Sequence, residues 1–206
     1  AARREDGKRL QDTVSAETWA RLETWAARRG VLLENLQGLD AWFVGLTISL
    51  MEMQTLGLDP KLGLDRHFAR RATEAGKQTE GLETGAEQIA LFDGLEPGLQ
   101  QQSLEDVLRD AEQMEENINR LHDLWRRGDA EGIEAETNQR MRDEYPGLYD
   151  RINRDRNLAW LPVLQERLDR GDKDDDVLVV VGALHLLGDD GLVHLLREAG
   201  YTVERL

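Results

Sequence analysis

The chain has 206 residues, of which 40% are hydrophobic and 33% are charged, a composition typical of a globular domain and not of a disordered one. It carries 26 Lys and Arg against 41 Asp and Glu, and a formal net charge of −15 disfavours sequence-independent binding to nucleic acids or anionic membranes. It has no cysteine, which excludes disulfides, thiolate nucleophiles and Cys-ligated metal sites.

Helix signals dominate the first part of the chain. Ser15 is a typical N-cap and Gly30 a typical residue at a helix end, so together they delimit a first helix. The most apolar stretch, from Leu39 to Leu50, is too short to span a membrane and predicts a buried core helix. The predicted helices cover residues 15–29, 39–56 and about 60–75, the last interrupted at residues 63–65.

A short strand is predicted near residues 79–83, directly before another helix. Thr84 and Glu87 form a capping box that starts this helix, which places Glu83 at a strand-to-helix junction. Apolar residues at helical spacing then predict three further long helices, over about residues 103–127, 130–144 and 145–168.

The last 36 residues differ in kind from the rest. Residues 171–176 form a polar turn, and the run VLVVV at 177–181 reads as a strand that is buried on both faces. The loop GALHLLG (182–188), a helix capped by Asp189 or Asp190 and a final strand over 201–206 complete a strand–loop–helix–strand unit. We therefore expect one domain over residues 1–206 with an α/β fold, in which a small mixed sheet carries a large helical insertion and residues 1–170 are mostly helical.

His185 is the histidine that the sequence singles out. It follows the end of the predicted buried strand, between Gly182 and Gly188, at the edge where open α/β sheets place their ligands. The glycines let the backbone turn tightly and approach a bound group. His122 and His194 read as ordinary surface or core histidines, and His67 is a weaker candidate near the break at residues 63–65.

Other polar residues are candidates only in combination. Glu83 could stabilise a helix N-terminus without any further role, and Asp65 could be an N-cap. The run RDRN at 154–157, which contains Arg156 and Asn157, could be a solvated face of its helix.

The segment LGLDRHFARRATEAGKQTEGLETGAEQIALFDGL (62–95) resembles the TraB/GumN family, in which GLD, GK and LET recur in this order. The segment VVVGALHLLGDDGLVHLLREAGYTVERL (179–206) is similar to the family's second Gly-x-x-His motif with its closing helix and strand. The run RDRN corresponds to the family's Arg-Asn position. The resemblance covers the chain from about Gly7 onward.

The family, including the TIKI metallopeptidases, has two Gly-x-x-His motifs, and this chain contains only the second, Gly182 to His185. The first motif belongs to an N-terminal strand–helix–strand unit of about 30 residues or more. We expect that unit to be missing here, since the chain begins abruptly without Met; this leaves open whether the chain is incomplete or half of the site is lost.

The resemblance implies hydrolysis of peptide bonds that depends on a divalent metal. His185 would be a metal ligand, Glu83 a ligand or general base, and Arg156 with Asn157 a clamp for an oxyanion or carboxylate. An imidazole and a carboxylate suit manganese, cobalt or zinc. One histidine and one glutamate are fewer than the three protein ligands of a typical catalytic zinc site.

The alternative is a binding or regulatory module, for a peptide or for a hydrophobic ligand such as haem. Met and Trp side chains of residues 42–54 would line its cavity, although they could equally pack as core. The resemblance also implies a bacterial protein of the periplasm or cell surface, while no signal peptide is visible in residues 1–8. The substrate, the metal and the oligomeric state stay open.

Overall fold

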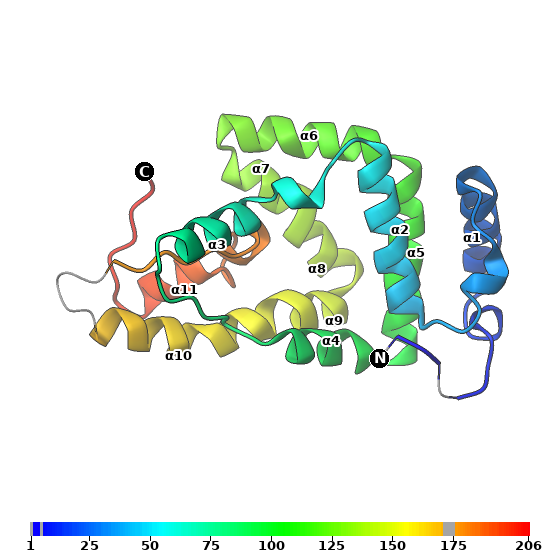
Figure 1. Ribbon diagram of the computed structural model, residues 1–206, viewed down its shortest axis with the longest axis horizontal. Helices are drawn as coiled ribbons and strands as arrows, with labels where there is room; N and C mark the ends of the chain where they lie inside the picture. Colours follow the sequence, from blue (N-terminus) through cyan, green and yellow to red (C-terminus); the bar gives the residue numbers. More distant parts are fainter. Residues whose placement is uncertain (1, 5, 171–175) are drawn as a thin grey trace. The chain divides into compact units, whose positions relative to one another are not determined.

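The computed structural model describes residues 2–4, 6–170 and 176–206. The chain divides into two compact units, which are described separately here (Figure 1). Unit 1 comprises residues 1–60 and 83–120, and unit 2 comprises residues 61–82 and 121–206.

Unit 1 is built from helices whose ends follow the capping signals of the sequence. The Ser15 hydroxyl accepts a hydrogen bond from the Thr18 amide at 3.0 Å, and Gly30 ends the same helix with a φ of 67°. Thr84 and Glu87 form the predicted capping box. The helices are α1 (Ala16–Arg29), α2 (Ala41–Thr55), α4 (Gly85–Asp93), α5 (Pro97–Glu112) and the first half of α6 (Met114–Arg127), with short 3-10 turns η1 (Leu10–Asp12), η2 (Leu33–Asn35) and, at the end of the unit, η3 (Pro60–Leu62).

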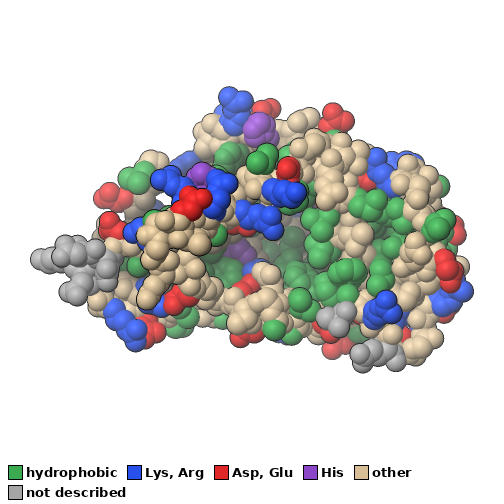
Figure 2. Space-filling view, viewed as in Figure 1, with side chains coloured by type: hydrophobic (Ala, Val, Ile, Leu, Met, Phe, Trp, Pro, Cys, Tyr) green, Lys and Arg blue, Asp and Glu red, His purple; other side chains and the backbone are tan. Residues whose placement is uncertain are grey.

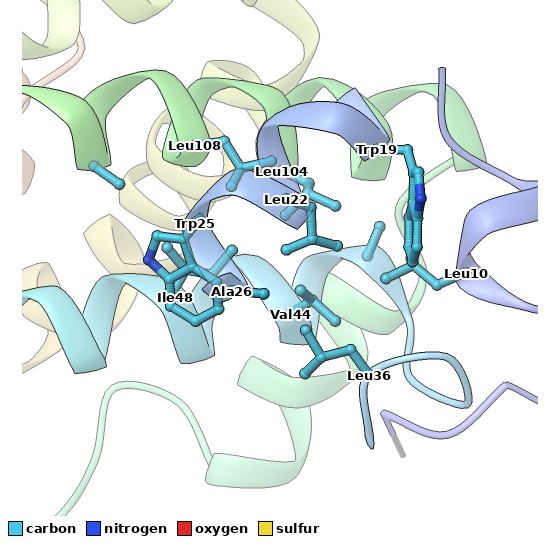
Figure 3. Packing of buried hydrophobic residues seen from close by; sticks show 12 residues of the cluster. Leu10, Trp19, Leu22, Trp25, Ala26, Leu36, Val44, Ile48, Leu104 and Leu108 are labelled. Carbon is cyan, nitrogen blue, oxygen red and sulfur yellow. The ribbon is translucent and has the colours of Figure 1, made fainter. Parts of the chain in front are cut away.

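The core of unit 1 lies among α1, α2 and α5 (Figure 3). Leu22, Val44 and Leu104, one from each helix, are fully buried, and α2 lies along α5. Because α2 is apolar on most of its circumference, its other side leaves Leu46 and Leu50 about half exposed, at 47% and 44%.

Unit 1 also buries one carboxylate. Glu52 of α2 is 2% exposed and accepts hydrogen bonds from Trp25 Nε1 at 2.7 Å and from Arg29 Nε at 2.7 Å. Arg29 Nη2 donates to the second oxygen at 2.5 Å, so the pair is bidentate. The hydrogen bonds from Arg29 hold the pKa of Glu52 below its ordinary value, which burial alone would raise.

Unit 2 is also helical, and two of its helical stretches contain a π-helical turn. Its core is small, with Trp160, Leu164 and Leu192 buried and Leu82 and Val181 packed against them. The elements are α3 (Leu64–Glu74), the second half of α6, α7 (Ala130–Glu134), the π turn η4 (Ala135–Gln139), α8 (Arg140–Glu144), α9 (Pro146–Tyr149), the π turn η5 (Asp150–Arg154), α10 (Asp155–Arg170), the 3-10 turn η6 (Ala183–Leu186) and α11 (Leu192–Glu198).

The prediction of an α/β fold with a small mixed sheet is wrong, because the described residues form helices and no sheet. Residues 79–83, 177–181 and 201–206, each predicted as a strand, lie outside regular structure. A strand needs a partner strand, and no backbone hydrogen bond joins residues 177–181 to another described residue. The part of the predicted polar turn at 171–175 lies outside the described residues.

The predicted helices are confirmed as helical regions, but with different boundaries. The helix predicted over 103–127 is two helices, α5 and α6, separated at Gln113, and Pro97 at the first position starts α5. The helices predicted over 130–144 and 145–168 each contain a π turn. That residues 1–206 form a single domain stays a prediction.

Among the described residues, no helix has both the length and the apolar character that crossing a bilayer requires.

Candidate functional site

The loop GALHLLG (182–188) holds His185 in unit 2. Gly182 precedes the 3-10 turn η6, and the His185 amide donates to the Gly182 carbonyl at 3.0 Å. Gly188 has a φ of 76°, in the left-handed region that favours glycine. Helix α11 then begins at Leu192 with Gly191 as its N-cap, and not at Asp189 or Asp190 as predicted. His185 therefore lies in a tight turn and not at a sheet edge.

The His185 ring is half-buried and touches three side chains of α10. Its Nδ1 lies 2.7 Å from Asn157 Oδ1, and its Nε2 lies 3.2 Å from Arg156 Nη1. The ring also packs against the indole of Trp160, with 4.6 Å between centroids. An amide oxygen only accepts and a guanidinium only donates, so Nδ1 carries the ring proton and Nε2 presents its lone pair.

Arg156 is fixed on both sides of its guanidinium. The group lies over the Trp160 ring, 4.7 Å from the centroid, and Nη1 donates to the Ile152 carbonyl at 3.0 Å as well as to His185 Nε2. The Arg156 guanidinium is thus held beside Nε2 of His185.

Behind His185 lie three buried asparagines, Asn138, Asn153 and Asn157, which are 1%, 5% and 1% exposed. Asn157 Nδ2 donates to Asn153 Oδ1 at 3.1 Å, and Asn153 Nδ2 donates to Asn138 Oδ1 at 3.0 Å. Asn138 Nδ2 donates in turn to Glu134 Oε2 at 3.0 Å. We call this row, from Glu134 to Asn157, the asparagine row.

The far end of the asparagine row is charged. Glu134 forms an ion pair with Arg142, and Arg142 Nη1 donates to the Tyr149 hydroxyl at 3.0 Å. The Tyr149 hydroxyl lies 3.4 Å from Asp190 Oδ2. Burial raises the pKa of the Tyr149 phenol, so this group stays neutral and acts as a hydrogen-bonding group near pH 7.

Of the predicted site residues, the structure brings together His185, Arg156 and Asn157. Asp65 and His67 lie exposed on α3, where the His67 ring packs edge-on against Phe68 at 5.3 Å. Neither has a hydrogen bond to the His185 cluster among the described residues. Glu83 belongs to unit 1, where its Oε1 accepts a hydrogen bond from Gln88 Nε2 at 2.9 Å.

Sequence reasoning missed Asn138, Asn153 and Glu134. A signal was present, because asparagine is unfavourable inside a helix and Asn138 and Asn153 both fall inside predicted helices. Trp160 was missed as well, since an apolar residue at helical spacing reads as ordinary core.

The described residues contain no group of three or more His, Asp and Glu side chains that could hold a metal ion. His185 Nε2 is a suitable single ligand, but the guanidinium of Arg156 lies on its lone-pair side.

Comparison with known proteins gives one family and two relatives. A family model described as the TraB/PrgY/gumN family matches residues 1–205. The chain is similar to the uncharacterized protein YbaP of Escherichia coli strain K12 and to that of Shigella flexneri, each 24% identical over 188 residues. The match covers 91% of this chain and 68% of each relative. No solved structure matches the chain.

Proposed function

Because this chain belongs to the TraB/PrgY/gumN family, we propose that it is a divalent-metal-dependent hydrolase that acts on peptide bonds. The observation that carries the proposal is the His185 ring, whose Nε2 lone pair faces the Arg156 guanidinium in a half-buried turn. A basic ring nitrogen can bind a divalent ion, and a cation beside it can stabilise the oxyanion that develops in peptide hydrolysis.

An imidazole nitrogen and a carboxylate are ligand types that bind divalent metal ions. His185 Nε2 is a neutral imidazole nitrogen, and Glu83 is our proposed second ligand, which together suit manganese, cobalt or zinc. Such an ion would supply an activated water and polarise the substrate carbonyl. The two residues form part of a ligand set, since catalytic zinc sites usually have three protein ligands.

The assignment of Glu83 rests on the family resemblance. Glu83 is the central residue of the LET run at 82–84, which recurs in the TraB/GumN family after the GLD and GK motifs.

The protein's own residues would bind and orient the substrate. Arg156, which lies over the Trp160 ring, can donate to a substrate carboxylate or to a developing oxyanion. Asn157 holds the ring of His185 through Nδ1 and so aims Nε2 at the same place. Arg156 would have to turn from His185 toward the substrate for Nε2 to bind another group.

Metal binding tests the assignment of His185. We expect Mn²⁺ or Zn²⁺ to bind the untagged full chain in calorimetric titrations, and His185→Ala to weaken binding about tenfold or more, because residues that merely orient a ligand already contribute that much. The matched control is His194→Ala, a half-buried histidine on α11. Equal affinity in the wild type and His185→Ala would refute the ligand role.

Peptide cleavage tests the reaction. We expect the full chain to cleave a library of unstructured peptides in the presence of Mn²⁺, and chelator, Glu83→Gln or His185→Ala to abolish cleavage. Metal binding without cleavage would favour the second candidate function, binding of a peptide or hydrophobic ligand.

One observation supports that second candidate. Figure 2 shows hydrophobic side chains gathered over α2, and Leu46, Leu50 and Met53 of this helix are 47%, 44% and 39% exposed. Trp42, which the sequence suggested as part of a cavity lining, is instead buried and stacks on Phe92 with 5.7 Å between centroids. An apolar face of this kind suits a hydrophobic ligand or an amphipathic helix, with haem as one candidate.

The cellular location is proposed by analogy with the family. We propose the periplasm or the cell surface of a bacterium, with a peptide or small molecule as substrate. Fractionation of cells that express the full-length gene product would test it, and recovery in the cytoplasm alone would refute it.

A further inference from the structure

The hydrogen bonds of the asparagine row have a fixed direction. An asparagine side chain can be turned by 180° with little change in shape, so its orientation is decided by its partners. The Leu184 carbonyl oxygen lies 2.8 Å from Asn138 Nδ2 and 3.3 Å from Asn153 Nδ2, and the Asp190 carbonyl oxygen lies 2.8 Å from Asn157 Nδ2. A backbone carbonyl only accepts, and therefore each of the three side chains must present its NH₂ group there.

This orientation uses every amide hydrogen of the three side chains. Each NH₂ group donates once to a backbone carbonyl and once toward Glu134, to the next oxygen in the row. Each amide oxygen accepts from the neighbour on the His185 side, and Asn157 Oδ1 accepts from His185 Nδ1. All donors along the row thus point from His185 toward the Glu134 carboxylate.

We propose that the asparagine row is a one-way hydrogen-bond relay that holds His185 as the Nδ1–H tautomer and keeps the lone pair on Nε2. Asn138 and Asn153 are positioning residues, which act on the ring through Asn157. Turning any one of the asparagines would set its oxygen against a backbone carbonyl, so the row cannot reverse without losing several buried hydrogen bonds.

The two π turns place the donors of the relay. Asn138 and Asn153 each occupy the fourth position of a five-residue π turn, η4 and η5. π turns inside α-helices are rare and are frequently found at functional sites. Both asparagines reach the same acceptor, the Leu184 carbonyl, which lies next to His185 in the turn η6.

The role of Nε2 as a metal ligand rests on the proposed function, whereas the tautomer of His185 rests only on the hydrogen bonds of its ring. Long-range ¹H–¹⁵N spectra of the uniformly labelled full chain report the tautomer of each neutral histidine directly. At about pH 8.5, where a histidine of ordinary pKa is neutral, we expect His185 to show the Nδ1–H pattern. Exposed His122, on α6, serves as the internal reference. A wild-type His185 with the same pattern as His122 would overturn the proposal without any variant.

Three variants then test the relay. Asn157→Leu removes the acceptor, and we expect the tautomer ratio of His185 to shift toward Nε2–H by about fivefold, as the loss of one hydrogen bond predicts. Asn157→Asp loses the two hydrogen bonds that Nδ2 donates but keeps the acceptor for Nδ1, so the folded variant should keep the Nδ1–H pattern. Asn138→Leu breaks the relay two residues away and should shift the ratio by about twofold.

The matched control is Asn119→Leu, an exposed asparagine on α6, which should leave the His185 pattern unchanged. An unchanged ratio in folded Asn157→Leu would overturn the relay. An unchanged ratio in folded Asn138→Leu would overturn the positioning role of Asn138 and Asn153. Because these spectra need neither metal nor substrate, they separate failure of the relay from failure of the hydrolase proposal.

Discussion

Two buried polar side chains of α2, Glu52 and Trp42, differ in whether their polar atoms have hydrogen-bond partners. Glu52 is 2% exposed, yet both of its oxygens accept hydrogen bonds from Arg29. The indole Nε1 of Trp42 is buried and has no hydrogen-bond partner among the described residues. An ionised group cannot be left unpaired in this way, because the penalty for burying an unpaired charge is far larger than for an unpaired indole N–H.

We therefore expect Glu52→Ala to lower the free energy of unfolding at pH 7 by about 3–5 kcal/mol, because it leaves Arg29 and Trp25 without their acceptor. The measurement is urea unfolding followed by tryptophan fluorescence. Glu17→Ala is the control, since Glu17 pairs with Arg21 on the exposed face of α1 and is itself 72% exposed. That change should cost less than about 0.5 kcal/mol.

The pH dependence of this contribution has a definite sign. Because the folded pKa of Glu52 is lowered from 4.5, the stabilisation is fully present above pH 4.5 and is lost as the pH falls through the folded pKa. The stability difference between the wild type and Glu52→Ala should therefore shrink on acidification below pH 4.5. A difference that stays constant down to the acid transition would contradict the lowered pKa.

The sequence predicts some residues of the site well and others poorly. His185 stands between two glycines, so its turn is visible without the structure. Arg156 and Asn157 were predicted only through the family resemblance. Their positions in a charged run on a helix do not reveal that they contact His185. Asn138 and Asn153 were missed since their function depends on π turns, for which the sequence pattern has no clear signature.

Among the elements, the helix starts predicted from capping residues are confirmed, whereas the predicted strands are wrong. Helix caps depend on residues within three or four positions of each other, and the caps at Ser15 and Thr84 are confirmed. A strand depends on a partner elsewhere in the chain. Residues 177–181 have the composition of a buried strand, but no described residue pairs with them.

The turn that carries His185 offers a paired test of two glycines. At Gly188 the φ of 76° is unfavourable for any other residue, and an added Cβ would collide with the Glu134 carboxylate, which Arg142 and Asn138 hold in place. We expect Gly188→Ala to lower the free energy of unfolding of unit 2 by about 1–3 kcal/mol.

Gly182→Ala is the matched control. Its φ is −58°, and the nearest atom to an added Cβ is His185 Cδ2 at 3.7 Å, an ordinary van der Waals contact. Thermal unfolding should show a near-neutral change at Gly182 and a clear loss at Gly188. Equal effects at both positions would mean that the turn does not depend on the left-handed residue.

At the scale of the whole molecule, an apolar extended segment is exposed. Val177 and Leu178 are 63% and 67% exposed, and their backbone groups have no partner among the described residues. A segment with both properties readily pairs with another chain. We therefore expect the chain to self-associate as its concentration rises.

Leu178→Lys tests this expectation, since a charge on an exposed strand disfavours pairing. Light scattering after size-exclusion chromatography should show a smaller mean mass than for the wild type at the same high concentration. The control is Leu168→Lys, a leucine that is 53% exposed on the helix α10, which should not alter the mass. An equal mass in the wild type and Leu178→Lys would locate any association elsewhere.

The π turns also constrain how the length of this chain can vary. A π turn is an α-helix with one extra residue, and successive residues of an α-helix differ by about 100° around the axis. Deleting one residue within Ala135–Gln139 would let the turn relax to a regular α-helix and would change the direction in which the Asn138 side chain leaves it. Asn138 could then no longer reach both Glu134 and the Leu184 carbonyl. Substitutions of η4 residues other than Asn138 are thus expected to be tolerated where single-residue deletions are not, so the turn depends on the count of its residues and on the identity of one of them.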